Sequence, residues 1–153
     1  FNDKIKNDIF RAKKIGIVYQ QNNLLPDFTA LENLYLASLS INDNKKMAML
    51  KAEKLLKKIG LSSRSNHFPS QLSGGESQRV AIARAIINDP DIILADEPTG
   101  SLDMKTAKDI FALLNNQKKR NRLIIFATHN RFFAKKADYL LELTNGSIKS
   151  TNV

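Results

Sequence analysis

The stretch at residues 72–103 constrains the fold of this chain more than any other part, and it reads LSGGESQRVAIARAIINDPDIILADEPTGSLD. Residues 92–95 are apolar without alternation, which is typical of a strand buried on both faces of a parallel sheet. Two carboxylates, Asp96 and Glu97, follow at its carboxyl end. Adjacent carboxylates repel each other when they are desolvated, so they indicate either a solvated acidic turn or a site for a cation or ligand. Ligands of open α/β sheets bind at this end of the strands.

The beginning of the same stretch predicts a helix. Ser73 and Glu76 are three residues apart and form a capping box. Gly74 and Gly75 let a ligand approach the backbone closely, and the exposed N–H groups of a helix N-terminus favour an anion such as phosphate. The same four residues also suit an ordinary capped helix. Arg84, further along, is expected to be solvated or paired. Apolar residues at helical spacing predict the buried face of the helix: Val80, Ala83, Ile86 and Ile87.

Taken together, these blocks resemble the nucleotide-binding domain of ATP-binding-cassette (ABC) transporters. The resemblance makes residues 72–85 the signature motif, residues 92–97 the Walker B strand and residues 101–103 the D-loop. It implies an α/β fold with a P-loop NTPase-like core, in which helices cover a mostly parallel sheet and a helical subdomain is inserted.

The resemblance also implies roles for single residues in binding and hydrolysing ATP with Mg²⁺. Asp96 would hold Mg²⁺ through water, and Glu97 would be the general base for the attacking water. Gln20, which follows a predicted strand at 15–19, matches the Q-loop glutamine that helps to coordinate the metal and the water. His129, which follows a second apolar run at 123–128, matches the switch histidine that contacts the γ-phosphate. The family often has Asp after that histidine, and Asn130 here weakens a local contact.

The remaining implied residues concern a second ATP-binding subunit. Two such domains would meet head to tail and enclose two ATP molecules. Asp103 would link the two sites across this dimer. The residues that would face the ATP bound to the other subunit are Ser73, Gly74, Gly75 and Glu76.

The chain is expected to divide into a core segment at 1–20, a helical subdomain at 21–88 and a second core segment at 89–153. The first segment opens with a short helix at 3–11. In the subdomain, the exposed apolar loop at 24–28 indicates a partner surface. Thr29 and Glu32 form another capping box, which begins a helix that ends near Leu39.

A second helix of the subdomain is expected to end at Gly60, as its C′ residue. His67 lacks a partner at metal-ligand spacing and is expected to be structural or exposed. The second core segment holds a helix after Asp103 and a terminal hairpin, strands 139–143 and 147–150, around an Asn145-Gly146 turn. The residues expected to face inward from the second subdomain helix are Met47, Leu50, Leu55, Leu56 and Ile59.

No glycine of this chain begins the GxxxxGK[ST] pattern that cradles nucleotide phosphates. The family has that loop upstream of Gln20, so the resemblance puts it before Phe1. Its strand is expected to lie centrally in the sheet, directly beside the strand at 92–97. The chain therefore resembles the C-terminal two thirds of a domain, and we expect these residues alone to be poorly soluble and to hydrolyse no ATP.

The net charge of +9 fits either nucleic acid or an anionic membrane surface. The lysines are scattered, however, and lack the interleaved aromatic residues that stack on bases, so solvated helix faces are expected and no nucleic acid. The absence of cysteine excludes a disulfide framework and thiolate metal sites. No apolar run reaches the roughly 18 residues of a membrane span. The resemblance implies transmembrane permease subunits as partners, bound near residues 20–39 at the cytoplasmic face of a bacterial inner membrane.

Within the family, residues 19–34 and 65–72 look most like the ATPase subunits of bacterial lipoprotein-releasing complexes. ATPases of macrolide-export and cell-division complexes share similar blocks and are alternatives. Soluble ABC ATPases of translation or chromosome maintenance are less similar. The translation factors usually carry TNHLD where residues 99–103 read TGSLD, and the chromosome proteins lack the QRVAIARA continuation. An inert product of a decayed or truncated gene is a further alternative, against which the intact carboxylates and histidine argue.

Overall fold

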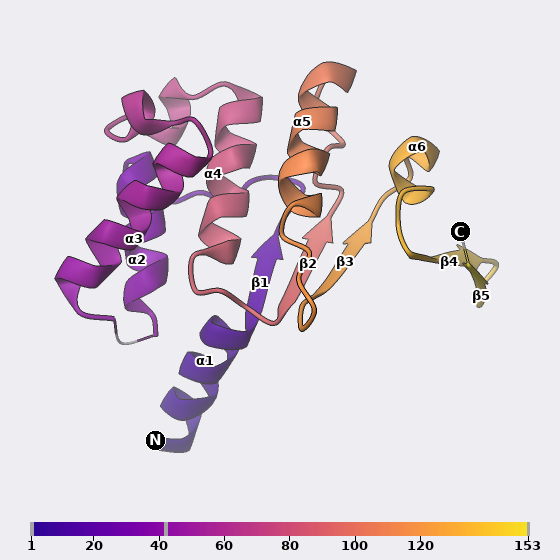
Figure 1. The fold of residues 1–153 in the computed structure, drawn as a ribbon, viewed down its shortest axis with the longest axis horizontal. Helices are drawn as coiled ribbons and strands as arrows, with labels where there is room; N and C mark the ends of the chain where they lie inside the picture. The colour runs from indigo at the N-terminus through magenta and orange to yellow at the C-terminus, as the bar shows by residue number, and fades with distance from the viewer. Residues whose placement is uncertain (1, 42, 153) are drawn as a thin grey trace.

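A computed structural model describes residues 2–41 and 43–152 of the chain, with the side chains of residues 6–41 and 43–150. Its elements, in chain order, are α1 (Asn2–Lys14), β1 (Ile15–Val18), α2 (Ala30–Leu39), α3 (Lys45–Lys58), the short 3₁₀ helices η1 (Ser62–Arg64) and η2 (Pro69–Gln71), α4 (Gly74–Ile86), β2 (Ile92–Asp96), α5 (Met104–Asn115), β3 (Leu123–Ala127), α6 (Arg131–Ala134), β4 (Tyr139–Thr144) and β5 (Ser147–Asn152) (Figure 1). Helix α1 is longer than predicted at both ends, and α6 was not predicted.

Three parallel strands form the central sheet in the order β1-β2-β3 (Figure 1). Ile93 of β2 pairs with Gly16 of β1 on one side and with Ile124 of β3 on the other. The expected α/β class is confirmed. The expectation of a further strand directly beside β2 is wrong, because both edges of β2 are already hydrogen-bonded. Parallel strands bring their carboxyl ends to one edge of a sheet, which is where the candidate catalytic residues follow β1, β2 and β3.

Helices α4 and α5 cover one face of this sheet. Val18 and Ile93 of the sheet pack with Ile82 of α4 and Ile110 of α5, and all four are fully buried. The contact with α4 is tight, since a Cβ atom at Gly16 would lie only 2.1 Å from the carbonyl oxygen of Ala85.

The other face of the sheet is uncovered in the part of the chain that the structure describes. Ile17 is 39% exposed, Ile125 is 50% exposed and Leu123 is 55% exposed. The prediction that the strand at 92–95 is buried on both faces therefore holds only for the face that α4 and α5 cover. Its alternate residues Ile92 and Leu94 are partly exposed.

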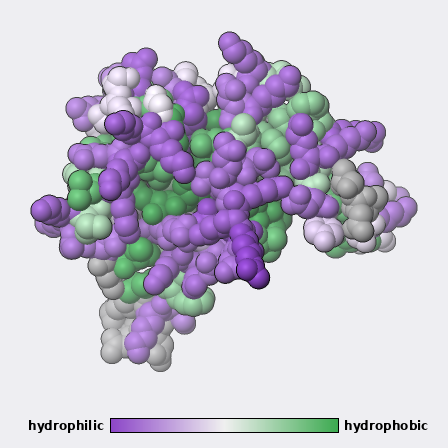
Figure 2. Space-filling model, viewed as in Figure 1, coloured by the Kyte–Doolittle hydropathy of each residue, from purple (hydrophilic) through white to green (hydrophobic). Residues whose placement is uncertain are grey.

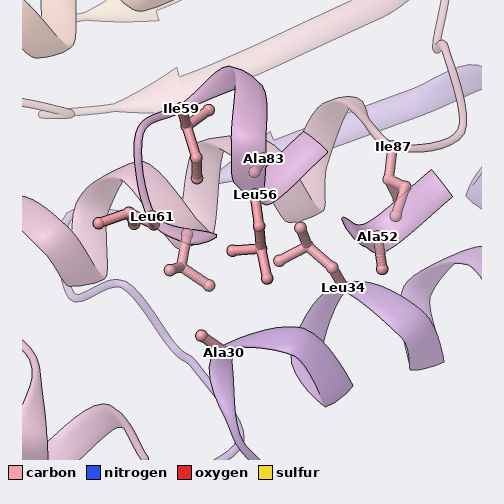
Figure 3. Close-up of a cluster of buried hydrophobic side chains, with 9 residues drawn as sticks. Ala30, Leu34, Ala52, Leu56, Ile59, Leu61, Ala83 and Ile87 are labelled. Carbon is pink, nitrogen blue, oxygen red and sulfur yellow. The ribbon is translucent and has the colours of Figure 1, made fainter. Parts of the chain in front are cut away.

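Helices α2 and α3, with η1 and η2, pack against α4 and form a helical block. Its core contains Leu34 and Leu56, and the alanines of the same cluster let the helices approach closely (Figure 3). Val80 of α4 belongs to this buried cluster as well. The capping box of Thr29 and Glu32 is confirmed, with both reciprocal hydrogen bonds present. Gly60 follows α3 with φ of 74°, so its prediction as the C′ residue is confirmed as well.

The predicted inward face of α3 is confirmed at Leu55, Leu56 and Ile59, which pack in the core of the helical block, and is wrong at two positions. Met47 is 46% exposed and Leu50 is 39% exposed, although both were expected to face inward. The residues that point into the helical block are Ala48, Ala52 and Leu56, spaced four apart along one side of the helix. The close packing of α3 on α2 selects this stripe of small residues. Figure 2 shows mostly hydrophilic side chains on this side of the molecule, with hydrophobic ones gathered over the helical block.

Strands β4 and β5 form an antiparallel hairpin beyond α6, apart from the three-stranded sheet (Figure 1). Asn145 and Gly146 have φ of 49° and 75°, which confirms the predicted turn, since a two-residue hairpin turn of type I′ needs positive φ at both positions. Among the described residues, no helix combines the length and the apolar character that crossing a bilayer requires.

Candidate active site

Glu97 follows β2 in a strained conformation that directs it toward β3. Its φ is 41°, a left-handed value that is uncommon for any residue other than glycine. Its backbone N–H donates to the carbonyl of Ala127 (3.0 Å), and its own carbonyl accepts from the N–H of Gly100 (3.0 Å). The strained residue is therefore fixed by the neighbouring strand on one side and by the following turn on the other.

The carboxylate of Glu97 is held by the residues that follow β3. One oxygen accepts from the Thr128 hydroxyl (3.1 Å), and the other accepts from the backbone N–H of His129 (2.7 Å) and lies 2.7 Å from His129 Nδ1. The Glu97 side chain is 16% exposed, whereas that of His129 is 79% exposed. The structure thus brings Glu97 and His129 into direct contact, the two residues that the resemblance implied as general base and switch histidine. Thr128 was missed, although its hydroxyl stands directly between the apolar strand and the histidine.

Gln20 follows β1 and Asp96 is the last residue of β2, so both lie at the same edge of the sheet. A Cβ atom at Gly100 would lie 3.6 Å from Gln20 Nε2 and 3.4 Å from Glu97 Cβ, so the Gln20 amide rests against the turn that carries Glu97. Asp96 is exposed. No described residue forms a hydrogen bond or ion pair with its side chain. Mg²⁺ is bound by oxygen ligands, usually one or two carboxylates completed by phosphates and water, and Asp96 with Gln20 fits that pattern.

Asn130 has a local role that sequence analysis did not assign. Its side-chain oxygen accepts from the N–H of Phe132 (3.0 Å) and caps α6. Its backbone N–H donates to the Thr128 hydroxyl oxygen (3.1 Å). Asn and Asp are equally good N-caps, so Asn130 supports the turn after His129 as an aspartate would.

The N-terminus of α4 has the predicted capping box. Ser73 Oγ accepts from the N–H of Glu76 (3.2 Å), and Glu76 accepts from the N–H of Ser73 (2.8 Å). Arg64 Nε donates to the second oxygen of Glu76 (3.1 Å). The N–H of Ser73 and, to a smaller extent, Arg64 hold the pKa of Glu76 below its ordinary value. Glu76 therefore serves the helix end as an anion, while Ser73 and Gly74 remain exposed. His67, whose ring lies 3.2 Å from Arg64, is structural as expected.

The two glycines of α4 differ in their surroundings. Gly75 is buried, and a Cβ atom there would lie 2.5 Å from Thr106 Cγ2 of α5. Gly74 is exposed, and a Cβ atom there would make an ordinary contact of 3.6 Å with Leu102. Gly75 therefore has a packing reason to be glycine, whereas the sequence had indicated close approach of a ligand for both. Of these two glycines, only Gly74 has a backbone that a ligand can approach.

Asp103 caps α5. Its Oδ1 accepts from the backbone N–H groups of Lys105 (3.0 Å) and Thr106 (3.1 Å), and its Oδ2 accepts from the Thr106 hydroxyl (2.6 Å). The Thr106 hydroxyl is the main reason that the pKa of Asp103 lies below its ordinary value. The first turns of α4 and α5 thus lie side by side, with Asp103 and Gly74 on adjacent helix ends.

The loop after β1 is fixed by two residues whose part was not predicted. Arg84 of α4 donates to the carbonyls of Asn22 (2.9 Å) and Asn23 (2.5 Å), so it is paired, and its partners are backbone groups. Burial lowers the pKa of this guanidinium. Asn33 of α2 is 1% exposed and hydrogen-bonds to the backbone of the loop at 25–29. Neither role leaves a local pattern, because both partners are backbone groups.

Comparison with known proteins agrees with this geometry. The family model described as ABC transporter matches residues 2–100. A solved structure of the ATP-binding cassette MJ0796, dimeric in a post-hydrolysis state with ADP and Pi, is 36% identical and superposes with a TM-score of 0.83, covering 99% of this chain and 67% of its own. A second dimeric structure of MJ0796, described as a bacterial ABC transporter cassette, is 37% identical with the same TM-score. The chain belongs to the ABC transporter family.

Within this family, the chain is similar to lipoprotein-releasing system ATP-binding proteins named LolD. The protein from Rickettsia bellii is 45% identical over 96% of this chain and 67% of its own length. The protein from Wigglesworthia glossinidia brevipalpis is 47% identical over 94% of this chain and 63% of its own length. LolD 2 from Chlorobaculum tepidum is 45% identical over 92% and 58%. The chain spans about two thirds of the length of these relatives, or somewhat less.

Proposed function

We propose that the native protein containing this chain is the ATP-hydrolysing subunit of a bacterial ABC transporter that releases lipoproteins from the inner membrane. The observation that carries the chemistry is the carboxylate of Glu97, fixed by Thr128 and His129 at the carboxyl ends of parallel strands. The lipoprotein substrate rests on the similarity to the LolD proteins over nearly the whole chain.

Glu97 is the general base for the attacking water. The Thr128 hydroxyl and the His129 N–H both donate to it, which suits a carboxylate that acts only as an acceptor. These donors hold the carboxylate in one orientation, and a fixed orientation is what a base needs to take a proton from a water in line with the phosphate. The mostly buried side chain of Glu97 loses little freedom when ATP binds.

His129 stabilises the γ-phosphate through its other ring nitrogen. Because Nδ1 faces Glu97, Nε2 on the exposed side of the ring is the atom available to a phosphate oxygen. Asp96 and Gln20 would hold Mg²⁺, which offsets the charge of the phosphates when it is bound.

The exposed features of the chain fit two protein partners. Ser73 and Gly74 lie exposed at the N-terminus of α4, as a surface that meets the ATP of a second ATP-binding subunit requires. Leu25 and Phe28, 42% and 39% exposed in the loop fixed by Asn33, form an apolar surface for transmembrane permease subunits. The protein would then lie at the cytoplasmic face of the bacterial inner membrane. Nucleic acid is not proposed as a partner.

The test uses the native full-length protein, assembled with its membrane subunits in lipid vesicles that contain a lipoprotein. We expect ATP hydrolysis coupled to lipoprotein release. The Glu97→Gln variant should lose at least about a hundredfold in kcat, because a positioned base contributes that much, and should still bind ATP. Glu142→Gln is the matched control, since Glu142 is exposed on β4.

Two results would contradict the proposal in different ways. A Glu97→Gln protein that hydrolyses ATP at the wild-type rate would overturn the assignment of the base. If the wild-type complex hydrolyses ATP without releasing lipoprotein, the proposed ATPase activity holds but the proposed substrate is wrong. The protein would then be assigned to a macrolide-export or cell-division complex.

A further inference from the structure

Thr106 is the residue at which the first turns of α4 and α5 meet. Its methyl carbon Cγ2 would be 2.5 Å from a Cβ atom at Gly75, so the methyl group occupies the space that the absent side chain leaves. Its hydroxyl donates to Asp103 Oδ2 at 2.6 Å, and its backbone N–H donates to Asp103 Oδ1 at 3.1 Å. One side chain thus contacts the signature segment with one branch and the D-loop carboxylate with the other.

A second contact supports the same junction. Leu102, the neighbour of Asp103, lies 3.6 Å from the position of a Cβ atom at Gly74. Leu102 and Thr106, on either side of the N-cap of α5, therefore each pack against one of the two glycines of α4. Asp103 is itself exposed, so its carboxylate would sample several rotamers without the two groups that Thr106 provides.

We infer that Thr106 is a positioning residue, which fixes the Asp103 carboxylate relative to the exposed backbone of Ser73 and Gly74. The inference rests on the proposed function, in which both groups meet a second subunit. Because Thr106 holds them in one arrangement, the two groups approach that subunit as a single rigid surface. Neither has to be ordered separately when the dimer closes on ATP.

If Thr106 served only to cap α5, its variants would lose activity only in proportion to their loss of stability. The two branches of the side chain can be removed one at a time, which separates this role from the positioning of Asp103. Thr106→Val keeps a methyl branch against Gly75 and removes the hydroxyl. Thr106→Ser keeps the hydroxyl and removes the methyl, and Thr106→Ala removes both. Each variant should fold, since the Asp103 carboxylate that loses a partner is exposed to water.

The experiment measures kcat and KM for ATP in the native full-length protein, together with thermal unfolding. It also measures ATP-induced dimerisation by size-exclusion chromatography, in a Glu97→Gln background that retains the nucleotide. The matched control is Asn44→Ala, which removes a comparable cap from α3 in the helical block, where Asn44 accepts from the N–H of Met47 (2.9 Å). Asn44 lies outside the proposed catalytic and dimer surfaces.

We expect Thr106→Val to lower kcat by at least about fivefold with nucleotide affinity of the monomer unchanged, because small misplacements of positioning groups cost up to about a hundredfold. Dimerisation should require more ATP. Thr106→Ser should retain more activity than Thr106→Val, and Thr106→Ala less than either.

The inference is overturned if the Thr106 variants keep the wild-type kcat and dimerisation. It is also overturned if they lose activity only in proportion to their thermal destabilisation, as Asn44→Ala should. If the wild-type protein itself hydrolyses no ATP, the proposed function fails instead, and the two failures are therefore distinct.

Discussion

Replacing Asn33 with alanine tests whether one buried amide holds the loop between β1 and α2. The Asn33 side-chain oxygen accepts from the N–H of Leu25 (2.8 Å). Its NH₂ group faces the carbonyls of Leu25 (3.1 Å), Phe28 (3.0 Å) and Thr29 (3.0 Å). Since the group has only two hydrogens, three carbonyls share two donors. The amide therefore contributes about three hydrogen bonds, all to backbone groups of one loop.

The magnitude of the loss follows from these contacts. At about 1 kcal/mol net for each hydrogen bond, the three bonds contribute about 3 kcal/mol. Leu25 and Phe28 are 42% and 39% exposed, so water reaches part of the freed backbone. We therefore expect Asn33→Ala to lower the free energy of unfolding by about 2–3 kcal/mol. For a protein of about 150–250 residues this corresponds to a fall in Tm of about 5–10 °C.

The assay is urea unfolding of the native full-length protein, combined with limited proteolysis of the loop at 20–28. Asn121→Ala is the matched control, because Asn121 is exposed in the connection between α5 and β3. The variant at position 33 should also be cut faster within the loop, since the loop loses its fixed conformation. A change in unfolding free energy below about 0.5 kcal/mol, equal to the control, would refute the argument. The loop would then owe its shape to other contacts.

Three further predictions use the same native protein or the chain itself. Gly16→Ala should lower the free energy of unfolding in urea by about 3 kcal/mol or more, because the new Cβ meets the Ala85 carbonyl oxygen at 2.1 Å. Gly60→Ala should lower it by only about 1–2 kcal/mol, because Gly60 has φ of 74° but open space around it. Lys119 holds the pKa of Asp89 below its ordinary value, so the stabilisation by this pair is present above about pH 4 and is lost as pH falls through the lowered pKa. The difference in Tm between the wild-type protein and Asp89→Asn should therefore shrink between pH 7 and pH 3. The purified 153-residue chain should be poorly soluble and show no ATPase activity, and steady phosphate release from it would refute that expectation.

Local signals in the sequence predicted the element boundaries that depend on neighbouring residues. The capping boxes at Thr29 and Ser73 are present with both of their hydrogen bonds. The turn at Asn145 has the positive φ that its sequence indicated. In each case the partner groups lie within three residues, so a short stretch of sequence contains the whole interaction.

The sequence predicted the buried face of α3 only in part, since Leu56 and Ile59 are buried as expected and other residues of the predicted face are not. Helix α3 carries two candidate stripes, a larger one with Met47 and Leu50 and a smaller one with Ala48 and Ala52. Hydrophobicity alone favours the larger residues, but the small ones are buried, because they allow α2 to approach. That choice depends on the shape of the partner helix, which no local pattern contains.

The residues of the candidate site divide in the same way. Asp96, Glu97 and His129 were identified because family motifs mark them. Thr128 and Asn33 were not, because their partners are a carboxylate 31 residues away and the backbone of a loop. A hydroxyl or amide has the same sequence signature whether it faces water or holds a catalytic group. Such supporting residues therefore become visible only when the contacts are known.

Strand order decides whether this site can exist at all. Neighbouring strands lie about 4.8 Å apart, so a further strand inserted between β2 and β3 would move Thr128 and His129 about 5 Å farther from Glu97 and break every contact to its carboxylate. The observed pairing of Asp96 with Ala127 keeps these residues adjacent. Within the described part of the chain, only the outer edges of β1 and β3 are free to receive another strand of this sheet. The edge of β3 is the one beside His129, so a strand added there would leave the contacts of Thr128 and His129 to the Glu97 carboxylate in place.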